Sequence, residues 1–324
     1  MRAPLATGST ASARSPAGQR AQQPNSRARA RLICLGYRAG GAVLRVLPGP
    51  AGRALAGAVG LATWGVGRDR RTVVAGNLRR VLGPEASAAV LHRTVRRAYV
   101  SYASYWASAA RLDAADPNVL RRQVAVTNPE RLLTAAARGR GLVLVLPHVG
   151  CWEAGAVWTA SLGYPLTTVG ELLEPPELFD WFVETRRRAR LTVLPPGAAT
   201  TAQLLEHLKL GGAIALVADR DVTGGGVPTP FFGAPARVPA GPAVIALRSG
   251  AAVVPVAIYQ EPRGRFTVEL QPELDTERSG DLRADVARLT RDMVAVFERL
   301  IAARPEQWHV FQPNWPEDDA AESP

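Results

Sequence analysis

One short apolar run constrains the fold of this chain more than any other feature of the sequence. Residues 141–146 are rich in valine and leucine and are bounded by turn residues, which is typical of a short, buried strand. Pro147 ends the run, His148 follows at once, and Glu153 stands five residues after the histidine. In open α/β sheets, ligands bind beyond the carboxyl ends of the strands. The run therefore predicts a core strand with His148 at a functional edge of the sheet.

Strand and helix patterns alternate along the rest of the chain. Apolar runs bounded by turn residues predict further strands at 165–169, 191–194, 213–218, 253–259 and 266–270. Helical spacing of apolar residues predicts helices at 72–82, 85–109, 129–137, 152–162, 176–190, 200–210 and 281–303. Alternation of this kind predicts the α/β class.

A second acidic residue follows another predicted strand. Asp219 comes directly after residues 213–218, so we expect its carboxylate at the same edge of the sheet as His148. A histidine beside a carboxylate is a candidate general base with the acid that orients it. The residues alone leave open whether Asp219 or Glu153 orients His148. They also leave open a structural role, in which His148 completes a hydrogen-bond network at the strand end.

The segment after Asp219 is rich in glycine and phenylalanine. Gly224-Gly225-Gly226 is not followed by Lys-Ser or Lys-Thr, so it is not a P-loop, and we predict a flexible loop. Phe231 and Phe232 either line an acyl groove or anchor this loop. Arg237 precedes a predicted helix start, where we expect it to meet a phosphate or a carboxylate.

Basic residues are concentrated at the N-terminal end of the chain. The net charge is +11, and residues 1–68 hold ten arginines and no acidic residue, whereas the remainder carries 29 basic and 28 acidic residues. Apolar stretches alternate with arginines in residues 32–64, a pattern typical of helices that lie in a membrane interface. Arginines and prolines interrupt every window long enough to span a bilayer. We predict contact with an anionic membrane surface; the alternative is ordinary helices packed on the domain.

Composition also disfavours other classes of protein. Cys34 and Cys151 are the only cysteines, and their spacing indicates neither a disulfide framework nor a metal site. Residues 1–30 lack the apolar region of a signal peptide, so we expect a cytoplasmic location. The near-neutral remainder of the chain and the lack of a recognised binding motif argue against a nucleic-acid partner.

Several segments form an ordered set of motifs. They are 102–106 (Tyr-Ala-Ser-Tyr-Trp), 147–155, 171–175, 182–195, 218–223 (Ala-Asp-Arg-Asp-Val-Thr), 231–233, 237–243 and 308–315. Together they resemble the bacterial lipid A biosynthesis acyltransferase family, over roughly residues 30–316. That family includes the late lipid A acyltransferases and the actinobacterial phosphatidylinositol mannoside acyltransferases, and the motifs agree better with the second branch.

The resemblance implies a fold and a domain organisation. We expect a mixed central sheet flanked by helices, as in glycerolipid acyltransferases. Residues 31–316 would form a single acyltransferase domain, beginning with membrane-interface helices at 31–68. We expect residues 1–30 to be a disordered basic arm and residues 317–324 to be a flexible tail.

The resemblance also implies roles for individual residues. His148 would be the general base that takes a proton from a sugar hydroxyl, with Asp219, where the mannoside branch commonly has Glu, as its partner. Glu153 is the alternative partner.

Four further residues are implied in substrate binding. Glu171 and Arg186 fall at motif positions that line the active-site groove, and Arg220 belongs to the acid-Arg-Asp block. We expect Arg186 and Arg237 to bind anionic parts of the donor or the acceptor; a surface salt bridge is the alternative for each. No metal and no cofactor are implied, because thioester acyl transfer requires neither.

The function that the resemblance implies is transfer of a long acyl chain, palmitoyl in this branch. The donor would be acyl-CoA, and the acceptor a mannose of phosphatidylinositol mannoside at the cytoplasmic face of the cell membrane. The alternatives are an acyltransferase for another glycolipid, such as a lipid A precursor, and a membrane-binding scaffold without activity. Acyl length, the acylated hydroxyl, a carrier-protein donor and the oligomeric state stay open.

Overall fold

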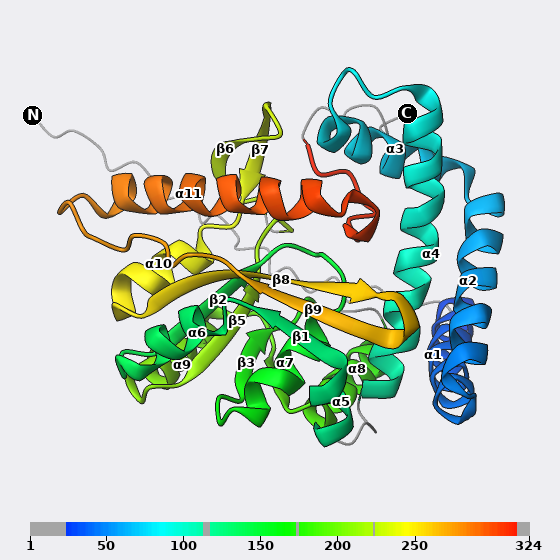
Figure 1. Cartoon of the computed structure of the whole chain (residues 1–324), viewed down its shortest axis with the longest axis horizontal. Coiled ribbons are helices and arrows are strands. Elements are labelled where there is room, and N and C mark those ends of the chain that lie inside the picture. Colours follow the sequence, from blue (N-terminus) through cyan, green and yellow to red (C-terminus); the bar gives the residue numbers. More distant parts are fainter. Residues whose placement is uncertain (1–23, 113–116, 173–174, 223, 316–324) are drawn as a thin grey trace, which may run out of the picture.

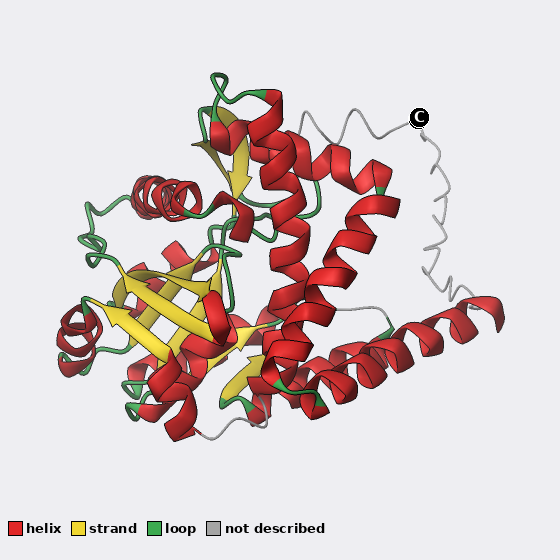
Figure 2. Cartoon of the chain, turned by 45° about the vertical axis from the view of Figure 1, so that its right-hand side comes forward, coloured by secondary structure: helices red, strands yellow, loops and turns green. Residues whose placement is uncertain are grey.

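The fold is built on a mixed sheet with helices on both faces (Figures 1 and 2). A computed structural model describes residues 24–112, 117–172, 175–222 and 224–315. In these ranges seven strands lie in the order β1 (Val124–Thr127), β9 (Arg265–Leu270), β8 (Ala252–Glu261), β2 (Leu142–Leu146), β5 (Ala213–Val217), β3 (Leu166–Val169) and β4 (Leu191–Leu194). Only β8 and β9 pair antiparallel; the other neighbours are parallel. The predicted α/β class with a mixed central sheet is confirmed.

Strand β2 lies at the centre because its sequence is apolar on both sides of the pleat. All five of its residues are buried, and it pairs in parallel with β5 and β8. Val143 and Val145 pack on one face, while Leu142, Leu144 and Leu146 pack on the other. A parallel strand buried on both faces reads as a continuous apolar run rather than an alternating one.

The helices form two layers around this sheet. One layer consists of α9 (Ala198–Lys209), α10 (Gly241–Ser249) and α11 (Leu282–Ala303), which share a core with the valine face of β2. The other layer consists of α5 (Pro117–Gln123), α6 (Pro129–Ala137) and α7 (Trp152–Ser161). Helix α8 (Pro176–Arg188) precedes β4, and two short 3-10 turns are η1 (Pro262–Gly264) and η2 (Pro305–Gln307).

Four N-terminal helices stand at one end of the sheet (Figure 1). They are α1 (Pro24–Val46), α2 (Gly49–Val66), α3 (Arg68–Leu82) and α4 (Ala88–Leu112). Helix α2 buries the small residues Gly52, Ala56 and Gly60, which recur every fourth position and so share one helix face. A Cβ on Gly60 would come 2.7 Å from the carbonyl oxygen of Tyr99 in α4, so glycine permits this close crossing.

The outward faces of α1 and α2 keep large apolar side chains exposed. These are Leu35, Tyr37, Val43, Val46, Leu55, Val59, Leu61 and Val66. None of the helices in the described ranges is both long and apolar enough to cross a membrane. The two helices cover most of the predicted range 31–68, although α1 begins earlier, and their contact with a membrane stays a prediction.

The ends of the chain differ in part from the expected boundaries. Residues 1–23 of the expected basic arm and residues 316–324 lie outside the described residues. The remainder of the arm is helical, because α1 begins at Pro24 instead of residue 31. Proline suits the first turn of a helix, and the alanine and arginine that follow it favour helix.

The segment after residue 224 forms a hairpin where we expected only a loop. Strands β6 (Val227–Phe231) and β7 (Ala234–Val238) pair antiparallel around Phe232 and Gly233, both of which have positive φ. Two residues with positive φ are what a tight hairpin turn requires. The side chain of Phe231 is buried against Trp308 and Trp315, so of the two interpretations the anchoring one is correct for Phe231.

Candidate active site

His148 occupies a tight loop between β2 and α7. Gly150 in this loop has a φ of 65°, and a Cβ there would overlap the carbonyl oxygen of Ile258 in β8. The backbone amide of Gly150 donates to the carbonyl of Gln307, and that of Cys151 donates to Ile258. The loop is therefore fixed to both β8 and η2, which holds the backbone of His148 in place.

Asp219 follows β5 and accepts three hydrogen bonds with its buried carboxylate. Its Oδ1 lies 2.5 Å from Nδ1 of His148. Its Oδ2 accepts from the backbone amide of His148 at 2.9 Å and from the indole nitrogen of Trp308 at 2.7 Å. The carboxylate of Asp219 therefore reaches the imidazole, as the sequence analysis expects. Nε2 of His148 has no hydrogen-bond partner among the described residues, and the side chain keeps 26% of its surface exposed.

The environment of Asp219 keeps its carboxyl group charged. Burial by itself would raise the pKa of this carboxyl, but the charge of His148 and the hydrogen bonds from His148 and Trp308 lower it below the ordinary value. A charged, fully buried carboxylate beside Nδ1 holds the proton on that nitrogen. The other ring nitrogen is then free to accept a proton.

Glu153, the alternative partner, lies in a different set of contacts. It is buried in the first turn of α7, where Tyr105 donates to its Oε1 at 3.0 Å. Arg186 of α8 forms an ion pair with the same oxygen at 3.4 Å. Burial, with the nearby Glu153 carboxylate, raises the pKa of Tyr105, so its hydroxyl stays a donor. Among the described residues no hydrogen bond joins Glu153 to His148.

A cavity of about 660 Å³ opens beside His148. Apolar side chains from the strands of the sheet line it, among them Leu144, Leu146, Val217, Val256, Ile258, Val268 and Leu270. Tyr102, Tyr105 and Trp106 form an aromatic wall on α4. The cavity is of the size usual for small-molecule sites, and most of its lining residues are apolar.

The predicted substrate-binding residues fall into two places. Glu171, Arg186 and Arg220 line the cavity together with His148. Arg220 pairs with Glu171, whose side chain is half exposed. Arg237 does not line it: it lies exposed on β7 and donates to the carbonyl of Gly226, four residues before α10 begins.

Asp221 holds the glycine segment, whereas Asp219 faces the histidine. The carboxylate of Asp221 accepts hydrogen bonds from the backbone amides of Gly224 and Gly226. In the described part of the chain, no group of three or more His, Cys, Asp or Glu is placed to hold a metal ion.

Three further residues of the site lie in the motif segments 102–106 and 308–315, to which the sequence analysis gave no individual role. Trp308 donates to Asp219, and Tyr105 donates to Glu153. His309 donates its backbone amide to the carbonyl of His148, and its ring lies 3.0 Å from the hydroxyl of Ser101. Both segments belong to the set of motifs found in the sequence, and their hydroxyl, indole and imidazole groups were the available signal.

Comparison with known proteins identifies the class to which this fold and site belong. The family model described as bacterial lipid A biosynthesis acyltransferase matches residues 21–317. The chain belongs to this family, and it is an acyltransferase.

Two relatives are similar over most of their length. A phosphatidylinositol mannoside acyltransferase of Mycolicibacterium smegmatis is 38% identical over 284 residues, which cover 87% of this chain and 90% of the relative. A phosphatidylinositol mannoside acyltransferase of Mycobacterium tuberculosis is 36% identical over 244 residues, 74% of this chain and 75% of the relative.

Proposed function

We propose that this acyltransferase moves a palmitoyl group from acyl-CoA to a mannose hydroxyl of phosphatidylinositol mannoside. The observation that carries the chemistry is the contact between His148 and the buried Asp219 at the wall of an apolar cavity. The acceptor follows from the names of the two relatives.

The first step is removal of a proton from the mannose hydroxyl by Nε2 of His148. A hydroxyl is a weak nucleophile at neutral pH, so a positioned base is needed. The oxygen attacks the thioester carbonyl and forms a tetrahedral intermediate. As the intermediate collapses, the carbon–sulfur bond breaks and the imidazolium returns its proton to the coenzyme A thiolate. Asp219 stabilises the imidazolium and fixes the ring orientation.

The lining of the cavity supports a long acyl chain as the transferred group. The aliphatic side chains that line it from the sheet offer a hydrocarbon chain an environment that water does not. Arg186, Arg220 and Glu171 supply the charged part of the lining, where a sugar or a phosphate would bind. Because Arg186 already pairs with Glu153, we assign it first to holding α8 against α7 and second to binding the substrate.

We place the enzyme at the cytoplasmic face of the membrane as a peripheral protein. The exposed apolar residues on α1 and α2 support this placement, together with the basic residues near them. Its acceptor, a phosphatidylinositol mannoside, is a lipid of that surface.

The test is transfer of labelled palmitoyl-CoA to purified phosphatidylinositol mannoside by wild type and by His148→Ala. We expect transfer by the wild type and its loss in the variant. His92→Ala is the matched control, because His92 is exposed on α4 and does not line the cavity. No transfer by folded wild type would refute the acceptor or the donor, and transfer to a lipid A precursor instead would favour the alternative. Equal rates in the His148 variant would refute the mechanism.

A further inference from the structure

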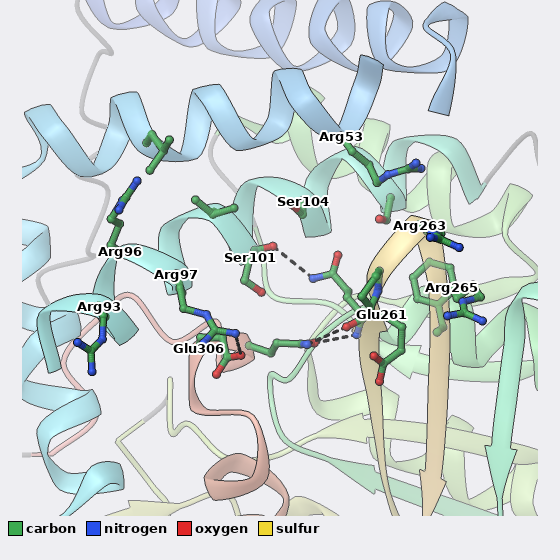
Figure 3. A pocket seen from close by; sticks show the side chains of 18 residues that line it. Arg53, Arg93, Arg96, Arg97, Ser101, Ser104, Glu261, Arg263, Arg265 and Glu306 are labelled. Atoms are coloured by element: carbon green, nitrogen blue, oxygen red, sulfur yellow. Dashed lines mark hydrogen bonds and ion pairs between the residues drawn. The ribbon is translucent and has the colours of Figure 1, made fainter. Parts of the chain in front are cut away.

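A second groove lies behind α4, away from the catalytic cavity. It has a volume of about 520 Å³ and is enclosed by α2, α4, η2 and the turn between β8 and β9 (Figure 3). It shares no lining residue with the cavity beside His148. Tyr102 and Tyr105 face that cavity, whereas Ser101 and Ser104 line the groove, so α4 separates the two.

The surface of the groove is basic and rich in hydroxyls. Helix α4 contributes Arg93, Arg97, Ser101, Ser104 and Ser108 at spacings of three and four, so these side chains form one stripe. Further arginines come from other elements: Arg53 from α2, Arg96 from α4, and Arg263 and Arg265 from the turn and start of β9.

Most of these arginines lack a carboxylate partner. Arg97 pairs with Glu306 at 3.0 Å. The other carboxylate, Glu261, already binds Arg304 and Thr267. For the remaining five arginines of the groove, no ion pair or hydrogen bond exists within the described residues. Unpaired like charges in one groove repel each other, so an anion bound there would relieve the repulsion.

Three of the unpaired arginines lie at one end of the groove. Figure 3 shows Arg53 reaching from α2 toward the hairpin that carries Arg263 and Arg265. A guanidinium nitrogen of Arg53 lies 3.3 Å from the position that a Cβ on Gly264 would take. Arg263 has a φ of 65°, a conformation that costs a non-glycine residue free energy. Arginine thus occupies a turn position at which glycine or asparagine would be unstrained.

We propose that this groove is a second site, separate from the catalytic cavity, which binds the phosphate group of an anionic lipid headgroup. Guanidinium groups bind phosphate oxygens in a bidentate manner, and the serine hydroxyls on α4 are further donors. The source is a membrane lipid because α2, which supplies Arg53 and the exposed Leu61 to the groove, also exposes the apolar side chains of Leu55 and Val59. Only this choice of source rests on the membrane placement proposed above; the phosphate assignment rests on the groove.

The test is binding of the full chain to phosphatidylcholine vesicles with and without phosphatidylinositol, measured by co-sedimentation. The variant Arg53→Ala/Arg263→Ala/Arg265→Ala is expected to lose on the order of 100-fold in affinity for the anionic vesicles, since each arginine near such a surface contributes about fivefold. All three side chains are exposed, so the fold tolerates the change. In detergent, the same variant is expected to keep wild-type acyl transfer.

Two control variants separate a phosphate site from diffuse attraction. Arg248→Ala/Arg283→Ala/Arg291→Ala removes the same charge from exposed positions on α10 and α11 and is expected to bind as wild type. Replacing Arg53, Arg263 and Arg265 by lysine keeps the charge and loses the bidentate geometry, with an expected loss of about tenfold.

Each remaining outcome is decisive. Unchanged binding of the alanine variant, an equal loss in the charge-matched control, or wild-type binding of the lysine variant would overturn the site. Saturable binding of soluble glycerol phosphate without any preference for anionic vesicles would overturn the lipid source. Vesicle binding as expected in a protein that transfers no acyl group would refute the proposed function and leave this site standing.

Discussion

Replacing Asp219 by asparagine tests the orientation of His148 with the least change in shape. All three groups that contact the carboxylate are N–H donors when Nδ1 carries the proton: Nδ1 itself, the backbone amide of His148 and the indole of Trp308. An asparagine offers one oxygen and one NH₂ group. If the NH₂ group replaces Oδ2, it faces two N–H donors, the amide of His148 and the indole of Trp308. If it replaces Oδ1, it faces only Nδ1 of the His148 ring. The second arrangement is therefore favoured.

In that arrangement the NH₂ group donates to Nδ1 and moves the ring proton to Nε2. The nitrogen that must accept a proton from the acceptor hydroxyl then already carries one. In Ser-His-Asp triads the equivalent tautomer change costs about 10⁴ in kcat. We expect a loss of about 10³–10⁴ in kcat for Asp219→Asn. We expect little change in thermal stability, because two of the three hydrogen bonds remain and the third is only reversed in direction.

The assay is steady-state transfer from palmitoyl-CoA, combined with nitrogen-15 NMR of the His148 ring to identify the tautomer. Asp292→Asn is the control, since Asp292 is a partly exposed carboxylate on α11 outside the cavity. A rate within tenfold of wild type, with folded protein, would refute the assignment of Asp219 as the orienting acid.

Three further predictions concern the surroundings of the site. Glu153→Gln should lower stability by about 2 kcal/mol in chemical denaturation, because Arg186 loses its partner, yet should lower kcat less than Asp219→Asn. Gly150→Ala should cost about 3 kcal/mol or more, whereas Gly139→Ala, also at positive φ but in open space, should cost about 1. Burial, with the charge of His148, lowers the pKa of His309 to about 3 from 6.5, so its contribution to stability is complete above pH 6.5 and is lost on acidification. Between pH 6.5 and about pH 4.5, the free energy of unfolding of His309→Gln should therefore fall by roughly 2–3 kcal/mol less than that of the wild type. Chemical denaturation at several pH values measures this, and an equal pH dependence of the two free energies would contradict it.

The central part of the fold follows directly from local sequence pattern. The runs that became β2 and β5 were predictable because both are short, apolar and bounded by turn residues. Two adjacent parallel strands end at one edge, so the meeting of His148 and Asp219 across 71 positions was also predictable. The choice between Asp219 and Glu153 as the partner of His148 was not predictable, because the direction of the His148 side chain depends on the loop that Gly150 holds in place.

Each feature that was missed has a physical reason of its own. Strand β1 has four residues and lies at the sheet edge, where little apolar pattern is needed. Strands β6 and β7 contain Pro228, Pro230 and Pro235, which argue against a strand unless it lies at an edge. Trp308 joins Asp219 from 89 positions away, and no local pattern distinguishes an indole that donates to a carboxylate from one that only fills the core.

Helix α4 lines both sites, one with each of two opposite faces. Its tyrosines and Trp106 form a wall of the catalytic cavity, and its arginines and serines line the basic groove on the opposite side. Ser101 stands between them, because it lines the groove while its hydroxyl contacts His309, whose backbone amide binds the carbonyl of His148. The close crossing at Gly60 fixes α2 to the same helix. A headgroup bound in the groove would therefore hold the catalytic wall at a fixed distance from the membrane surface, which is the geometry that a lipid acceptor requires.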